Sequence, residues 1–267
     1  MLRTRTLVAL VVLPFFFVIV LTGGALFQAT VVLLLAVSAW ELARLGRTGG
    51  YAPFLPGMWL TLGAILLATL RPDALGPGLT LAIIVTMAAS LHSYHSHKAP
   101  PLISFTLTLG IGLYLGWLGQ HLLLLRALPQ GEWWALTVLP VVFAADSGAY
   151  MFGVSFGRHK LLPWVSPNKT WEGYVGGIAS AVVVGAVAVG LWSLRAPGMR
   201  PLDGALLGLV IGVASPLGDL TVSSFKRQVG AKDTSHLIPG HGGLMDRMDT
   251  VLIAAALGYW YIVWFAG

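Results

Sequence analysis

Residues 174–194 read YVGGIASAVVVGAVAVGLWSL and contain no charged side chain. A helix of about 20 apolar residues is long enough to cross a hydrocarbon core about 30 Å thick. This stretch therefore predicts a membrane-spanning helix. The whole chain has the same character, since 57% of its 267 residues are hydrophobic and only 10% are charged. Soluble domains carry about 25% charged residues, so the composition indicates a membrane protein.

Eight more apolar stretches predict further spans, over residues 7–21, 25–40, 54–70, 78–91, 102–125, 133–153, 205–220 and 251–265. We therefore expect an all-α, polytopic transmembrane protein of about nine spans. It should form a single membrane domain over 1–267, with N-terminal spans in 1–132 and catalytic spans and cytoplasmic loops in 133–267. The alternative for the first stretch is a signal peptide, since Arg3 and Arg5 precede it. The absence of a small-residue cleavage site favours a span.

The positive charges predict an orientation. With nine spans, 12 of the 16 Lys and Arg residues fall on the side of the membrane that holds the N-terminus. Loops rich in Lys and Arg stay in the cytoplasm, so the N-terminus is expected inside. The net charge of +6 then reflects orientation and attraction to anionic lipids, and no interleaved basic and aromatic surface indicates nucleic acid. The absence of cysteine excludes disulfides, thiolate metal ligands and cysteine nucleophiles.

Glycines recur at the spacing that lets membrane helices approach closely. Gly204, Gly208 and Gly212 follow one another at intervals of four residues, and Gly112 and Gly116 repeat the interval. Small residues at this spacing allow two helix backbones to pack against each other in lipid. We expect these five glycines to serve helix packing.

Most polar side chains that can do chemistry lie in two stretches, 146–172 and 215–249, both expected at the cytoplasmic face. Three histidines lie elsewhere, and we expect His92, His95 and His97 in a solvated loop. No set of His and Cys residues has the spacing of a zinc site.

The second stretch begins with a potential helix face. If the eighth span continues as a helix beyond residue 220, then Asp219, Ser223 and either Lys226 or Arg227 point the same way. A carboxylate, a hydroxyl and a cation then face one space. The segment that follows is rich in glycine and polar side chains, with Lys232-Asp233 and then His241-Gly242-Gly243. Glycine lets backbone come close to a ligand, and successive free amides bind phosphate oxygens.

Four aspartates are candidates for holding Mg²⁺. Asp246 and Asp249 open the last span and share a helix face, and Asp219 precedes the glycine-rich segment. Asp146 lies inside an apolar run, where burying an unpaired charge is costly. Mg²⁺ usually binds through one or two carboxylates together with substrate phosphates and water. The spacing therefore predicts a phosphate and metal site, against the alternative of an ordinary solvated loop.

The first stretch leaves two roles open. Lys169 and Thr170 fit a contact with phosphate, but Thr170 fits a helix N-cap equally well. Glu172 is either a metal ligand or a residue that stabilises the start of the next helix through its dipole.

Residues 223–249 resemble the signature of the phosphatidate cytidylyltransferases, also called CDP-diacylglycerol synthases. The agreement covers Ser223-Ser-Phe-Lys-Arg, Lys232-Asp233, Ser235, Ile238-Pro239, His241-Gly-Gly and Asp246-Arg-Met-Asp249. Residues 215–219 and 146–173 also resemble the family, whereas the N-terminal spans match only in hydrophobic character. One position departs from the pattern. Asn168 stands where members often carry a lysine, so we assign no phosphate binding to it.

The resemblance implies an integral membrane transferase with a dimeric, multi-helix fold, placed in the bacterial inner membrane with its active site facing the cytoplasm. It implies CTP and phosphatidate as substrates, CDP-diacylglycerol and pyrophosphate as products, and Mg²⁺ as cofactor alongside a monovalent cation such as K⁺. Catalysis is then assigned to Asp219, Lys226 and Asp246, and metal binding to Asp146, Asp219, Asp246 and Asp249. Substrate binding is assigned to Lys169, Thr170, Ser223, Lys226, Arg227, Lys232, Asp233, His241, Gly242 and Gly243.

Two other functions fit part of the pattern. A transporter also places carboxylates and glycine-interrupted helices in the membrane, but the one-sided polar cluster and the lack of an inverted repeat argue against it. The second alternative is a neighbouring lipid enzyme. It is either a CTP-dependent polyprenol kinase, which releases CDP, or a cytidylyltransferase that acts on an ether-linked phospholipid.

Overall fold

The computed structural model of the protein describes residues 14–95, 100–237 and 242–266. Residues 14–22 are helical. The remaining helical elements, in chain order, are α2 (Gly24–Thr48), α3 (Leu55–Ala68), η1 (Pro72–Ala74), α4 (Leu75–His95), α5 (Pro101–Ala127), α6 (Gly131–Phe156), α7 (Trp171–Trp192), α8 (Pro201–Ala214), α9 (Pro216–Gln228), α10 (Met245–Tyr261) and η2 (Ile262–Ala266). Between α6 and α7 lie the strands β1 (Lys160–Leu162) and β2 (Ser166–Thr170).

Seven helical stretches of the described residues are long and apolar enough to cross a membrane: 24–48, 72–95, 101–127, 131–156, 171–192, 201–228 and 245–266. The protein is therefore an all-α, polytopic integral membrane protein, as predicted. The expected number of nine spans agrees roughly with these seven stretches. The other two correspond to α3, which has only 14 residues, and to helical residues 14–22, whose expected beginning at residues 7–13 lies outside the described residues.

The expected eighth span is divided into α8 and α9 at Ser215. Pro216 follows directly, and because proline has no backbone N–H, it suits the first turn of a new helix. The helix then continues beyond residue 220, as the sequence analysis required, and ends at Gln228.

The chain divides into two compact units that alternate along the sequence. Of the described residues, unit 1 contains 14–15, 24–95, 100–123, 225–237 and 242–248, and unit 2 contains 16–23, 124–224 and 249–266. The prediction of a single membrane domain, divided at residue 132, stays a prediction.

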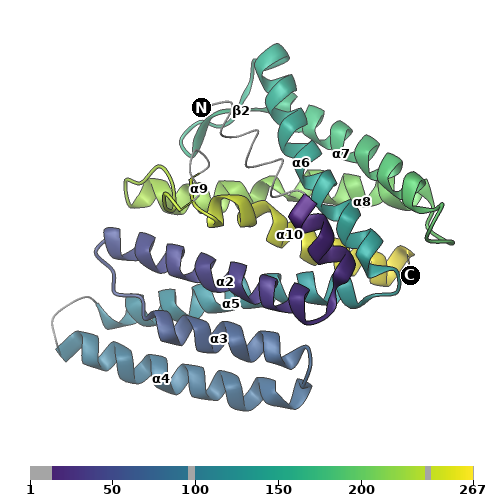
Figure 1. Ribbon diagram of the computed structural model, residues 1–267. Coiled ribbons are helices and arrows are strands. Elements are labelled where there is room, and N and C mark those ends of the chain that lie inside the picture. Colours follow the sequence, from purple (N-terminus) through teal and green to yellow (C-terminus); the bar gives the residue numbers. More distant parts are fainter. Residues whose placement is uncertain (1–13, 96–99, 238–241, 267) are drawn as a thin grey trace. The chain divides into compact units, whose positions relative to one another are not determined.

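In unit 1, helices α2, α3, α4 and α5 lie side by side (Figure 1). Glycines on α5 allow it to approach α3. A Cβ atom on Gly112 would lie 2.7 Å from the Cβ of Thr61, and one on Gly116 would lie 3.2 Å from the Cα of Leu62. The predicted packing role of these two glycines is therefore confirmed.

In unit 2, helices α6, α7 and α8 pack together (Figure 1). A Cβ atom on Gly204 would lie 2.1 Å from the carbonyl oxygen of Gly185, and one on Gly208 would lie 2.3 Å from that of Ala181. Real side chains do not tolerate such distances, so α7 and α8 touch backbone to backbone. The packing role predicted for these α8 glycines is confirmed.

The strands β1 and β2 form an antiparallel hairpin, in which Lys160 pairs with Thr170 and Leu162 with Ser166. This hairpin was not predicted from the sequence. It connects α6 to α7 and carries Lys169 on β2.

Candidate functional site

Lys226 and Asp246 form a nearly buried ion pair in unit 1. The Nζ of Lys226 lies 2.5 Å from Oδ1 of Asp246, and only 10% and 9% of the two side chains are exposed. The other oxygen of Asp246, Oδ2, accepts hydrogen bonds from the backbone N–H groups of Thr234 and Gly243, both at 3.0 Å. It also lies 3.1 Å from the Thr234 hydroxyl oxygen, whose single proton it shares with a Glu41 oxygen. Both oxygens of this carboxylate are therefore bound within the protein.

Two glycines permit this close packing. Gly242 has a φ of +80°, and a Cβ atom there would lie 3.1 Å from Oδ2 of Asp246 and 3.3 Å from Oδ1 of Asp233. A Cβ atom on Gly243 would lie 2.0 Å from the Thr234 hydroxyl oxygen. The backbone of the glycine-rich segment thus comes close to polar side chains, as expected from its composition. His241, which precedes these glycines, lies outside the described residues.

A residue that the sequence analysis missed organises the same segment. Glu41 on α2 is fully buried, with 0% of its surface exposed. One of its oxygens accepts from the Ser235 hydroxyl at 2.5 Å and from Leu244 N–H at 2.8 Å. The other accepts from the Thr234 hydroxyl at 3.0 Å and from Met245 N–H at 2.6 Å. Glu41 therefore ties together residues 234, 235, 244 and 245.

One signal in the sequence points to Glu41. It is the first acidic residue of the chain, and it follows directly after the apolar stretch that ends at Trp40. Because ionisable residues at the ends of or inside spans are costly, they mark candidate functional sites. The signal was overlooked because the predicted span stopped one residue earlier.

Unit 2 holds a second polar cluster. Lys169 on β2 forms an ion pair with Oδ2 of Asp219, and both side chains are about two-thirds buried. The Ser223 hydroxyl donates to Oδ1 of Asp219 at 3.2 Å, one helical turn along α9. The structure thus brings together three of the site residues expected from the sequence.

Asp249 is the most buried of the expected metal ligands, with 3% exposure. Its Oδ1 accepts from the N–H of Thr250 at 2.7 Å. Its Oδ2 is buried and has no hydrogen-bond partner among the residues that the structure describes. Asp219 and Asp146 are near enough to interact electrostatically with it. A Cβ atom on Gly218 would lie 2.2 Å from the carbonyl oxygen of Asp249, so the start of α9 touches α10 at this point.

The described residues include no group of three or more His, Cys, Asp and Glu side chains placed to hold a metal ion. The donor chemistry nevertheless fits Mg²⁺ at Asp249, because this hard cation prefers oxygen ligands and needs few carboxylates when substrate phosphates and water complete its shell. A buried carboxylate oxygen without a protein donor is costly unless a ligand compensates for its lost hydration. Asp246, the expected ligand in unit 1, has both of its oxygens bound within the protein.

Both residues whose roles stayed open in 146–172 make structural contacts, and the phosphate role of Thr170 and the metal role of Glu172 stay predictions. Thr170 is the N-cap of α7, and its hydroxyl accepts from Gly173 N–H at 3.2 Å. Glu172 accepts from the backbone N–H groups of Arg158 and His159 at 3.1 and 3.2 Å, and from Nδ1 of His159 at 2.6 Å. It fastens the connection after α6 to the start of α7.

Comparison with known proteins identifies the family of the chain. The sequence profile of the Cytidylyltransferase family matches residues 3–265, which is nearly the whole chain. The chain belongs to this family.

The cytidylyltransferase is similar along its whole length to curated bacterial relatives. It is 38% identical over 278 residues to the phosphatidate cytidylyltransferase of Pseudomonas aeruginosa, covering 100% of this chain and 98% of the relative. It is 35% identical over 288 residues to the phosphatidate cytidylyltransferase of Synechocystis sp., covering 97% and 96%. A match to the enzyme of the same name from Haemophilus influenzae reaches 46% identity over 134 residues, covering 49% and 46%.

Two basic residues assigned to substrate binding in this cytidylyltransferase are exposed. Arg227 donates to the carbonyl oxygen of Ala231 at 3.5 Å, and Lys232 lies beside the partly buried Asp233. Their substrate-binding roles stay predictions, as do those of the other site residues.

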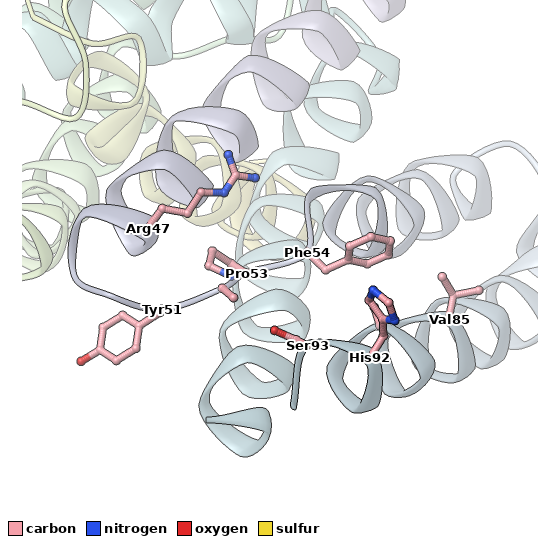
Figure 2. A pocket seen from close by; sticks show the side chains of 9 residues that line it. Arg47, Tyr51, Pro53, Phe54, Val85, His92 and Ser93 are labelled. Carbon is pink, nitrogen blue, oxygen red and sulfur yellow. The ribbon is translucent and has the colours of Figure 1, made fainter. Parts of the chain in front are cut away.

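Unit 1 of the cytidylyltransferase also has a pocket of about 630 Å³, lined by Arg47, Tyr51, Ala52, Pro53, Phe54, Val85, Ala89, His92 and Ser93 (Figure 2). This wall contains none of the expected site residues. His92 and His95 are exposed, as expected. The expected loop was wrong, since both lie in the last turn of α4, because the helix continues past the apolar stretch that predicted it. His97 lies outside the described residues.

Proposed function

We propose that this cytidylyltransferase transfers the cytidylyl group of CTP to phosphatidate, giving CDP-diacylglycerol and pyrophosphate for phospholipid biosynthesis. The observation that carries the proposal is the similarity, from end to end, to relatives that bear the name of this activity. An integral membrane protein also suits the acceptor, because phosphatidate is itself a membrane lipid.

In the proposed reaction, a phosphate oxygen of phosphatidate attacks the α-phosphorus of CTP. A new P–O bond forms to the lipid phosphate, the bond from the α-phosphorus to the bridging oxygen of the β-phosphate breaks, and pyrophosphate leaves with that electron pair. The attacking oxygen is already anionic near neutral pH, so no strong general base is needed. The main barrier is repulsion between two polyanions, and positioning and charge neutralisation therefore supply most of the catalysis.

The basic residues in our proposal neutralise phosphate charge. Lys226 is held by Asp246 and by burial in a defined position, and Lys169 is held by Asp219. Arg227 and Lys232 are exposed and so remain accessible to the charged groups of CTP or of the lipid.

We also propose Mg²⁺ as the cofactor, bound by Asp249 with Asp219 and Asp146 nearby, together with a monovalent cation such as K⁺. When bound, Mg²⁺ would neutralise phosphate oxygens during the displacement. The support in this chain is the buried Oδ2 of Asp249, which has no hydrogen-bond donor among the described residues.

The proposed location is the bacterial inner membrane, with the site facing the cytoplasm. The excess of Lys and Arg on one side supports this orientation. The acyl chains of the substrate stay in the bilayer, because each CH₂ group moved into water costs about 0.8 kcal/mol. A homodimer is proposed from the family resemblance alone.

Incubation of the purified protein with CTP labelled with ³²P at the α-phosphate, phosphatidate and Mg²⁺ tests the proposal. Label should appear in a lipid product only when phosphatidate is present, with release of pyrophosphate. Release of CDP instead would indicate a polyprenol kinase. Transfer of label to an ether-linked phospholipid but not to phosphatidate would indicate a cytidylyltransferase with that ether-linked acceptor. CTP-independent flux in proteoliposomes, with no labelled lipid, would favour a transporter.

A further inference from the structure

We infer that Glu41 is a positioning residue of the cytidylyl-transfer site, which acts by holding residues 234–235 and the start of α10 around Asp246. This inference rests on the proposed function for its consequence on activity. Glu41 lies on α2, far from the signature of residues 223–249 in the sequence, and no role in that signature would have been assigned to it.

Glu41 is enclosed by hydrogen-bond donors from a single segment. Its carboxylate is fully inside the protein and accepts four hydrogen bonds, at 2.5, 2.6, 2.8 and 3.0 Å. All four donors are N–H and O–H groups of residues 234–245, and none is a cation. A buried carboxylate is costly without such donors. The four hydrogen bonds of the Glu41 carboxylate therefore form only when residues 234, 235, 244 and 245 are held in this arrangement.

Two of the donors to Glu41 lie at a helix terminus. Leu244 and Met245 lie at the start of α10, where backbone N–H groups have no partner inside the helix. A carboxylate there satisfies these groups and interacts favourably with the helix dipole. Helices usually receive this cap from a neighbouring residue, whereas here it comes from a residue 203 positions away.

Glu41 is linked to Asp246 through Thr234. The Thr234 hydroxyl oxygen lies 3.0 Å from a Glu41 oxygen and 3.1 Å from Oδ2 of Asp246. Asp246 directly follows Met245, which Glu41 binds. Asp246 in turn binds Lys226. Glu41 thus holds the groups that surround Asp246, and through Asp246 it holds the position of the Lys226 ammonium.

The absence of cysteine allows a direct test on the whole protein. A nitroxide is attached at Leu237→Cys, an exposed position next to the held residues, and separately at Leu194→Cys, an exposed position after α7. Glu41→Gln keeps the size of the side chain but replaces one acceptor oxygen with an NH₂ group, which cannot accept from the backbone N–H that it faces, that of Leu244 or of Met245. Asp73→Asn, an exposed acidic position in η1, is the matched control.

Glu41→Gln should raise nitroxide mobility at position 237, leave it unchanged at position 194, and lower kcat/KM for CTP about 10- to 100-fold, the usual range for residues that orient a site. Asp73→Asn should change none of these. Thr234→Val removes only the bridging hydroxyl and should give the same changes at smaller amplitude, which keeps the test decisive if Glu41→Gln does not fold.

Unchanged mobility at position 237, or equal changes at both positions, would overturn the inference. So would near-normal kcat/KM in a variant whose segment has become mobile. If the unsubstituted protein transfers no cytidylyl group while Glu41→Gln still loosens position 237, the proposed function fails and the holding role of Glu41 stands.

Discussion

Lys226 and Asp246 are joined across 20 residues of sequence by an ion pair of 2.5 Å, from which solvent is largely excluded. A buried pair of this kind is a weak source of net stability, but loss of one partner leaves an uncompensated charge. The pair therefore fixes the position of a cation more than it strengthens the fold.

Asp246→Asn should abolish cytidylyl transfer and destabilise the protein by about 3–5 kcal/mol, since it leaves Lys226 charged and unpaired in a buried place. Transfer assays and thermal unfolding in detergent measure the two effects. The double variant Lys226→Ala/Asp246→Asn should lose less stability than the sum of the single variants, because no buried charge is left alone. Near-normal turnover of Asp246→Asn would remove Asp246 from the site.

Asp249→Asn should weaken Mg²⁺ binding without lowering the stability of the fold. The substitution removes the charge of a carboxylate whose Oδ2 has no hydrogen-bond donor among the described residues. Without Mg²⁺, the variant should therefore unfold at the same or a higher temperature. The Mg²⁺ concentration for half-maximal transfer should rise at least about 10-fold, whereas Asp73→Asn should leave it unchanged. An unaltered Mg²⁺ dependence would exclude Asp249 as a ligand.

Gly243→Ala should disrupt the segment that surrounds Asp246. The added Cβ atom would lie 2.0 Å from the Thr234 hydroxyl oxygen and 2.7 Å from a Glu41 oxygen. We expect a loss of about 1–3 kcal/mol in stability from overpacking together with a large loss of transfer. Gly63→Ala on α3 is the control, since outside its own helix no described heavy atom lies within 4 Å of the added Cβ. Equal behaviour of the two variants would contradict the proposed close packing.

Gly208→Ala should lower the thermal stability of unit 2, because the new Cβ atom would meet the carbonyl oxygen of Ala181 at 2.3 Å and force α7 and α8 apart. Gly190→Ala on α7 is the matched variant, since its Cβ atom would make an ordinary contact of 3.6 Å with Pro201. Thermal unfolding of both variants in the same detergent gives the comparison. A similar unfolding temperature for both would mean that the helices accommodate the methyl group.

Much of the fold was predictable from the sequence because membrane spans follow from length and hydrophobicity along the chain. The glycine spacing on α8 also predicted a packing surface, and the structure identifies its partners on α7. The hairpin of β1 and β2 was missed because β1 has only three residues and β2 is short and polar, and nothing in their pattern distinguishes them from a loop. The break between α8 and α9 was missed because the apolar stretch continues through Ser215 and Pro216.

The sequence by itself determined the spans, the family and the residues able to do chemistry, because these depend on composition and on spacing along one chain. Only the tertiary structure decided which donors each carboxylate receives. Asp246 receives Lys226 on one oxygen and backbone N–H groups on the other, Asp249 keeps a buried oxygen without a donor among the described residues, and Glu41 caps a helix 203 residues away. Hydrogen-bond partners depend on which groups the fold brings close together, and the local sequence does not indicate this.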